Sequence, residues 1–176
     1  PQSTNNFEII TQACDGNELL RNISSDIFKN NKTHYLLIYD PDTASIDWDA
    51  IKPFLRNWGE VIINHMVSDS IRALPQVKSS SKIEKYEQTY RTPLEELVMC
   101  GSDRATLEIR IKEIMKKLED TSHRRYYIAS FPFFNRKNSI VYNLIYGSSN
   151  IKGFQLFKET AWKTFGGKSS SKNINR

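Results

Sequence analysis

The sequence predicts a domain of the α/β class, because short apolar runs alternate with stretches of helical periodicity. Residues 35–39 form an apolar run that stops at Asp40, and a run of this length suits a strand covered by helices on both faces. Residues 18–28 before this run and residues 48–55 after it carry apolar side chains at helical spacing. Residues 61–63 form the next apolar run, and the resulting strand–helix–strand order predicts parallel strands joined by a helical crossover.

The start of the chain predicts one more strand. Residues 7–13 are strand-like, and residues 14–17 contain an Asp-Gly pair, which favours a turn. We therefore expect residues 35–39 to lie in the interior of a mostly parallel sheet. Ligands bind at the carboxyl ends of the strands in such sheets, so Asp40 and Asp42 stand where a functional site is expected.

The final third of the chain predicts an antiparallel hairpin. Residues 126–130 and 140–146 are strand-like, and two strands joined by a loop of this length pair antiparallel. Amphipathic helices are expected before the hairpin at residues 104–118 and after it at residues 153–165. The hairpin should therefore end the sheet, with a helix packed on it.

We expect one partial domain at residues 1–165. Residues 75–104 are polar and charged, with three successive serines, and are expected to form an irregular insertion. Within it, residues 92–95 are typical of a helix start, with Pro93 at the first helical position. Residues 166–176 are rich in Gly, Ser and Lys, a composition typical of a disordered tail.

Composition narrows the functional classes. The chain has 176 residues and a formal net charge of +5, which permits nucleic-acid binding without requiring it. Its two cysteines are too few for a disulfide framework or a thiolate metal site, so we expect a reduced, cytoplasmic protein without a bound metal. No apolar stretch approaches the length of a membrane span, and no membrane association is expected.

Two segments of the sequence are similar to one known family. Residues 39–42, Tyr-Asp-Pro-Asp, followed by Trp48, resemble the DPFG…W segment of the three-Cys-motif partner family. Residues 131–148 and the helix that contains Trp162 and Lys163 resemble the carboxyl-terminal half of that family, where a strand, a polar loop, a second strand and a W-K helix recur. The similarity covers most of the chain.

The chain departs from the family pattern at two positions. Asp42 stands where the family usually has Phe, and Phe133 stands where small or aliphatic residues are commoner. The resemblance nevertheless implies a Rossmann-like, class I methyltransferase-type three-layer sandwich. Its mostly parallel sheet would end in an antiparallel hairpin and lack its first strands.

The resemblance also implies a cofactor and a partner. The cofactor is S-adenosylmethionine, bound only together with an upstream half that carries a glycine-rich turn. Asp15 and Gly16 then belong to the cofactor site, with the Asp15 carboxylate near the adenine amino group. A cysteine-motif protein is the implied partner, and a homo-oligomer is another way to complete the sheet.

Asp40, Pro41 and Asp42 are the candidate catalytic residues. Asp40 and Pro41 resemble the acidic/amide-Pro motif of amino-methyltransferases, in which a side chain and a backbone carbonyl position the target nitrogen. The aromatic residue that would stack a flipped base is absent here, because Asp42 and Thr43 follow Pro41. The structural alternative is a strand end followed by a helix cap.

A second candidate site combines aromatic and cationic side chains. Residues 131–134 contain three phenylalanines for base stacking, and cations for phosphate contacts lie on either side of them in the sequence. The candidate nucleic-acid-binding residues are Arg124, Arg125, Asn135, Arg136 and Lys137. The alternative is a hairpin loop whose phenylalanines pack inward.

Two further possibilities rank lower. Asp40, Asp42, Asp47 and Asp49 offer oxygen ligands for magnesium, as in a metal-dependent nuclease, but no carboxylate-x-Lys strand accompanies them. His65 follows an apolar run and can act as an acid or base, although a structural histidine is commoner. The leading hypothesis is therefore S-adenosylmethionine-dependent methyl transfer to nucleic acid, and the alternative is a non-catalytic nucleic-acid- or protein-binding module that retains the fold.

Overall fold

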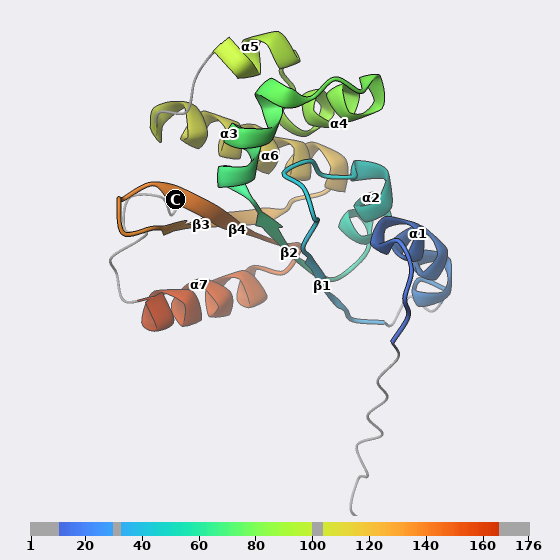
Figure 1. Ribbon diagram of the computed structural model, residues 1–176. Coiled ribbons are helices and arrows are strands. Elements are labelled where there is room, and N and C mark those ends of the chain that lie inside the picture. Colours follow the sequence, from blue (N-terminus) through green and yellow to red (C-terminus); the bar gives the residue numbers. More distant parts are fainter. Residues whose placement is uncertain (1–10, 30–32, 100–103, 166–176) are drawn as a thin grey trace, which may run out of the picture.

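A four-stranded sheet lies between helices on both of its faces (Figure 1). This computed structural model describes residues 11–29, 33–99 and 104–165, and the α/β class predicted from the sequence is confirmed. The strands are β1 (Leu36–Tyr39), β2 (Glu60–His65), β3 (Tyr127–Phe134) and β4 (Ile140–Ser148). The helices are α1 (Gly16–Ile27), α2 (Trp48–Arg56), α3 (Val67–Ala73), the 3-10 helix η1 (Leu74–Gln76), α4 (Ser80–Tyr90), α5 (Leu94–Met99), α6 (Arg104–Ser122) and α7 (Ile151–Phe165).

The described strands follow the order β1-β2-β4-β3 and mix two kinds of pairing. β1 pairs parallel with β2, with Tyr39 opposite Ile63. β4 pairs antiparallel with both β2 and β3, so the prediction of a mostly parallel sheet is wrong for the described strands. The sequence predicts that a hairpin exists, but local periodicity does not show which strand its second strand pairs with. In the structure that partner is β2.

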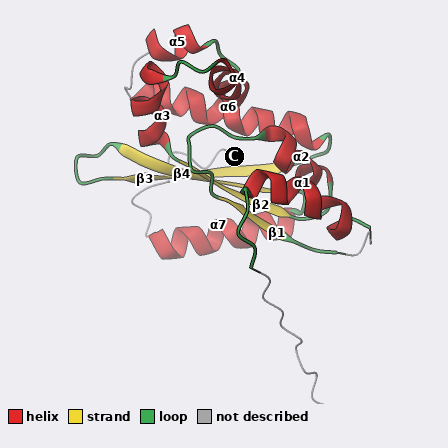
Figure 2. Ribbon diagram, turned by 45° about the vertical axis from the view of Figure 1, so that its right-hand side comes forward, coloured by secondary structure: helices red, strands yellow, loops and turns green. Residues whose placement is uncertain are grey.

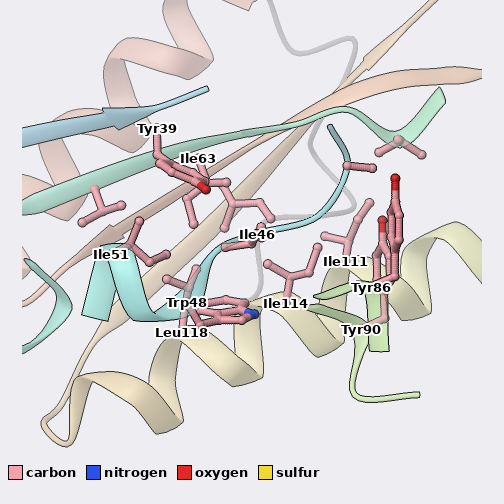
Figure 3. Close-up of a cluster of buried hydrophobic side chains, with 14 of the residues drawn as sticks. Tyr39, Ile46, Trp48, Ile51, Ile63, Tyr86, Tyr90, Ile111, Ile114 and Leu118 are labelled. Atoms are coloured by element: carbon pink, nitrogen blue, oxygen red, sulfur yellow. The ribbon is translucent and has the colours of Figure 1, made fainter. Parts of the chain in front are cut away.

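The larger core fills the space between the sheet and α1, α2, α4 and α6. Figure 3 shows Tyr39 and Ile63 of the sheet facing Ile51 of α2 and Ile114 and Leu118 of α6. The four aliphatic side chains among these are fully buried. Each such side chain stabilises the fold by about 1.5–3 kcal/mol relative to an exposed one.

The helix α7 forms a second core on the opposite face of the sheet (Figure 2). It buries Phe154 and Ala161 against side chains of β3 and β4. The rings of Tyr146 and Phe157 stack there with centroids 3.8 Å apart. Within the described chain this core reaches β2 but includes no residue of β1.

β1 therefore has one open face. Leu36 and Ile38 point to the α7 side of the sheet and are 53% and 65% exposed. The prediction that residues 35–39 form an interior strand covered on both faces is wrong for the described sheet, in which β1 is an edge strand. The apolar run shows that both faces of the strand are apolar, but not that helices cover both of them.

The chain ahead of β1 begins its first helix earlier than predicted. Asp15 is the N-cap of α1, and its carboxylate accepts a hydrogen bond from the Glu18 amide at 2.9 Å. The turn expected at residues 14–17 is thus the start of a helix. Of the strand predicted for residues 7–13, residues 11–13 are exposed and irregular, and residues 7–10 lie outside the described residues.

The first part of the segment expected to be an irregular insertion folds instead into α4, and α5 follows at the helix start expected at residues 92–95. Tyr86 and Tyr90 lie four residues apart on α4 and are almost completely buried, as is Leu97 of α5. Frequent Lys, Glu and Ser residues hide this helical spacing in the sequence. The predicted tail at residues 166–176 lies outside the described residues.

The carboxyl-terminal hairpin is confirmed, with a longer first strand than predicted. β3 continues through Phe134, and residues 135–139 form the turn. Pro132 fits within β3 because proline, which lacks an N–H, is tolerated on an edge strand. Phe131 and Phe133 therefore belong to a strand, and Phe131 is buried in the second core.

Candidate functional site

The carboxyl end of β1 opens into a cleft of about 610 Å³. Its walls come from the start of α1, the end of β1 and the loop that leads into α2. The cleft brings Asp15 and Gly16 together with Asp40, Pro41 and Asp42, which lie about 25 residues further along the chain. Its volume is that of an ordinary small-molecule site.

Asp15 and Gly16 shape the α1 side of the cleft. One carboxylate oxygen of Asp15 caps the helix, so the side chain is held at the helix N-terminus. A Cβ atom added to Gly16 would meet no other atom within 4 Å. Gly16 therefore leaves open space in the cleft wall, and the fold itself does not require glycine at this position.

Asp40 is positioned by the neighbouring strand. The Asn64 amide of β2 donates a hydrogen bond to Asp40 Oδ1 at 2.9 Å. Both side chains lie on the α7 side of the sheet, because they follow the parallel register of Tyr39 and Ile63 by one residue. This bond fixes one carboxylate oxygen of Asp40, while the side chain of Asp42 is exposed.

Tyr39 connects the walls of the cleft. Its hydroxyl donates to Asn17 Oδ1 at 2.8 Å and accepts from the Asp47 amide at 3.2 Å. Burial raises the pKa of Tyr39 above its ordinary value, so the hydroxyl stays protonated near neutral pH. Asp47 in turn caps α2 through the Ala50 amide and forms a 2.5 Å ion pair with Arg21 of α1.

The cleft is acidic. Asp15, Asp40, Asp42 and Asp47 line it, and Lys85 is the one cationic side chain among the described lining residues. Such a charge distribution attracts N–H donors and cations, and it repels phosphate groups. The arrangement can therefore hold an amine or an amino-purine edge more readily than an anion.

The lining fits one part of S-adenosylmethionine better than another. The free oxygen of Asp15 suits an adenine amino group, and the surrounding carboxylates suit a sulfonium cation. The amino-acid carboxylate of this cofactor needs clustered N–H donors, and the described lining offers Lys85 as its one cationic donor. Of the parts of this cofactor, the adenine amino group is therefore the one whose N–H donors match the carboxylates of the described lining.

The lower-ranked sites are not assembled in the described residues. Asp49 lines a separate hollow between α2 and α6, away from Asp40 and Asp42. No group of three or more His, Cys, Asp or Glu side chains in the described part of the chain is arranged to hold a metal ion. His65 is buried in the core, with Nε2 3.1 Å from the Tyr90 hydroxyl. Its surroundings are therefore those of a structural histidine, as the commoner alternative expected.

The structure separates the predicted nucleic-acid-binding residues into two groups. Arg136 and Lys137 lie at the tip of the β3–β4 hairpin, at the same end of the sheet as Asp40. Arg124 and Arg125 precede β3 at the opposite end, about 25 Å away along an eight-residue strand. The two sets of cations do not form one patch.

Local contacts occupy several of these groups. The Arg124 guanidinium lies 5.5 Å from the Trp58 ring centroid, and that of Arg125 lies 5.2 Å from the Tyr127 centroid. Asn135 Oδ1 accepts hydrogen bonds from the amides of Lys137 and Ser139 at 2.9 and 3.0 Å. The role of Asn135 is therefore to close the hairpin turn, whereas the cations at the tip are exposed.

Four residues of the cleft region were not predicted from the sequence. Asn17, Tyr39 and Asn64 hold its walls, and Lys85 contributes its cation from α4. Tyr39 carries a recognisable signal, since a polar hydroxyl at the end of an apolar strand needs a partner when buried. Lys85 carries no such signal, because the segment that contains it was expected to form an irregular insertion.

Comparison of the chain with protein-family models, with curated proteins and with solved structures gave no match. Among the described residues, no helix has the length and apolar character needed to cross a membrane.

Proposed function

We propose that this chain is a methyltransferase-like protein of the three-Cys-motif partner type. Its β1-end cleft would take part in S-adenosylmethionine-dependent methyl transfer to nucleic acid. The observation that supports this proposal is the cleft itself, which joins Asp15 and Gly16 to Asp40, Pro41 and Asp42. The resemblance assigned the first pair to the cofactor and the other three to the target.

The architecture included in this proposal is the carboxyl-terminal part of a class I methyltransferase-type, Rossmann-like sandwich. The parallel β1–β2 pair followed by an antiparallel hairpin supports it. In the described sheet β1 lies at an edge and its α7-side face is exposed, which leaves room for further strands and helices of such a sandwich to pack. A cysteine-motif protein as partner and a cytoplasmic setting, in which the exposed Cys14 stays reduced, belong to the same proposal.

Each side chain has a definite task in this mechanism. S-adenosylmethionine supplies the electrophilic methyl group when bound. Asp15 accepts a hydrogen bond from the adenine amino group, and the open space beside Gly16 admits the purine. Asp40, held by Asn64, accepts a hydrogen bond from the target amine and orients its lone pair, so its contribution is positioning.

Arg136 and Lys137 supply the phosphate contacts in this proposal. They share the sheet end with the cleft, whereas the cleft itself repels phosphate. A target base would then enter the acidic cleft, while phosphates of neighbouring nucleotides reach across the distance of about 14 Å between β1 and β3 to the hairpin tip. Arg124 and Arg125 have no part in this contact.

Calorimetric titration with S-adenosylmethionine tests the proposal, using protein expressed from the start of its own gene. Asp15→Ser removes the carboxylate and keeps a good N-cap, and we expect at least roughly tenfold weaker binding. Gly16→Ala should also weaken binding, because its methyl group enters open space in the cleft. Asp26→Asn on the exposed face of α1 is the matched control.

Asp40→Asn separates binding from transfer. Asparagine can still accept the Asn64 hydrogen bond, so cofactor binding should persist while methyl transfer to structured RNA or DNA falls. The absence of binding heat in the unmutated protein would refute the enzyme proposal. Equal affinities for Asp15→Ser and the control would refute the assignment of Asp15.

The alternative is a non-catalytic nucleic-acid- or protein-binding module. One observation favours it: Asp15 and Asp47 both cap helices, and this structural role alone explains their positions in the cleft wall. Such a module would bind nucleic acid with an affinity that falls steeply with salt, in the absence of the cofactor. Binding that ignores salt would exclude phosphate contacts as its source.

A further inference from the structure

A groove of about 550 Å³ lies beside the start of β3, between α6 and α7. β3 is the outer strand of the described sheet, and the two helices lie on its opposite faces (Figure 1). Tyr126, Tyr127 and Ile128 form the strand side of the groove. The groove lies toward the end of the sheet opposite to Asp40, so it is separate from the β1-end cleft.

The accessible floor of the groove is aliphatic. Met115 of α6 and Ile128 of β3 are half-buried, and Ile151 at the start of α7 is 41% exposed. These three side chains come from three different elements and converge on one hollow. They offer apolar area to a ligand without any opening of the main core.

The rim of the groove is cationic. Lys112 and Lys116 lie four residues apart on α6, and Lys158 faces them from α7. Like charges at this helical spacing repel one another. Glu119 is the one carboxylate in the lining, and none of the three lysines forms an ion pair with a carboxylate in the described ranges. The rim therefore lacks its complementary charge.

The aromatic rings of the groove are not free to stack on bases. Tyr126 and Phe154 are buried. The Arg125 guanidinium covers the Tyr127 ring, and the Lys158 ammonium lies 5.4 Å from the Phe154 centroid. Single-stranded nucleic acid needs open ring faces in addition to cations, so the groove favours an occupant with aliphatic side chains and carboxylates.

We propose that this groove binds an acidic segment of a partner protein. Aliphatic side chains of that segment pack on Met115, Ile128 and Ile151, and its Asp and Glu residues face the lysine rim. Complementary charge on the two surfaces speeds their encounter and fixes the orientation of the segment. This inference does not depend on methyl transfer, because the occupied groove leaves the β1-end cleft open.

Fluorescence anisotropy tests the proposal with a labelled twelve-residue peptide that alternates Glu or Asp with Leu. Three comparison probes are a peptide with Lys in place of the acids, a peptide with Ser in place of Leu, and a twelve-nucleotide single strand of dT. The groove variants are the double substitution Lys112→Glu/Lys116→Glu and the single substitution Ile151→Ser. The charge-matched control is Lys78→Glu/Lys82→Glu, whose side chains are exposed outside the groove.

We expect the acidic peptide to bind, and the double groove variant to weaken it by roughly tenfold or more at low salt. Ile151→Ser and the Ser-containing peptide should each weaken binding by a few-fold, and the control should match the unmutated protein. Circular dichroism melting checks that every variant is folded. The methyl resonances of Met115, Ile128 and Ile151 should shift on titration of the unmutated protein, which provides a test that needs no substitution.

Three outcomes would overturn the proposal. The first is no binding of the acidic peptide together with unchanged methyl resonances. The second is equal weakening by the groove and control variants, which would indicate a general attraction of acids to a protein of net charge +5. The third is tighter binding of the dT strand than of the peptide in a manner that depends on Lys112 and Lys116, which would make the groove a nucleic-acid surface.

Discussion

Acid should destabilise this protein through His65, because the imidazole is buried near the positive charge of Arg110. The imidazole is 1% exposed, with Nε2 near the Tyr90 hydroxyl of α4 and Nδ1 without a hydrogen-bond partner among the described atoms. Burial first, and then the positive charge of Arg110 on α6, lower the pKa of His65 to about 4. Asn143 of β4, its cross-strand neighbour, is uncharged.

The magnitude follows from the two protonation equilibria. The unfolded chain binds a proton at His65 with a pKa near 6.5, whereas the folded chain does so near 4. The unfolded state therefore binds more protons between these values, and stability falls as the pH falls through this window. At 1.36 kcal/mol per pH unit of difference, the free energy of unfolding drops by about 2 kcal/mol between pH 7 and pH 5, and by about 3 kcal/mol by pH 4.

Urea unfolding at pH 7 and pH 5 measures this effect, with His65→Gln as the test variant. Glutamine does not titrate, so the unmutated protein should lose about 2 kcal/mol more stability than the variant over this range. The control is the same substitution at an exposed histidine, His34→Gln. An equal loss in the unmutated protein and in His65→Gln would show that His65 is not the buried, neutral group described here.

Two further predictions concern the surroundings of the cleft and the hairpin tip. Asp47→Ala removes the N-cap of α2 and the partner of Arg21, so thermal unfolding should show a loss of about 1–2 kcal/mol, whereas Asp49→Ala, two residues further along, should stay within about 0.5 kcal/mol of the unmutated protein. Lys137→Glu should weaken binding of a structured RNA in a filter or gel assay and reduce its salt dependence, whereas Arg125→Glu should not; the opposite order would move the phosphate contacts to the other end of β3.

The parts of the fold that follow local rules could be predicted from the sequence. Asp47 directly precedes the helical spacing of residues 48–55, a position typical of a helix cap, and its carboxylate does accept the Ala50 amide. The apolar stripe of α6 and the hairpin were also expected, because each depends on periodicity within a short window. The position of β4 beside β2 could not be predicted in this way, since it depends on contacts between residues some 80 positions apart.

Two errors share a cause, which is that burial depends on neighbours. Ile38 belongs to an apolar run and was expected to be covered, yet α7 does not extend over it. Tyr90 stands in a polar segment that was expected to form an irregular insertion, yet it is fully buried beside α6 and His65. Composition shows which side chains are apolar, whereas the packing of the helices on the sheet determines which of them are buried.

The acidic residues of the candidate site were predicted from the sequence, but the residues that hold them in place were not. Asp15 and Asp40 were singled out from separate segments, and the cleft brings both of them together. The Tyr39 hydroxyl and the Asn64 amide, which hold the walls, were not singled out, because each serves a partner that is distant in sequence. Supporting residues of this kind become visible only when the strands are in register.

The distribution of charge over the sheet keeps the two proposed binding sites electrostatically separate. The carboxylates of the cleft lie at the carboxyl end of β1, and the lysine rim lies at the amino end of β3. Three strand spacings, or about 14 Å, separate these edge strands, in addition to the length of the strands. This separation exceeds the Debye length of about 8 Å at physiological salt, so each surface presents its own charge to its ligand with little interference from the other.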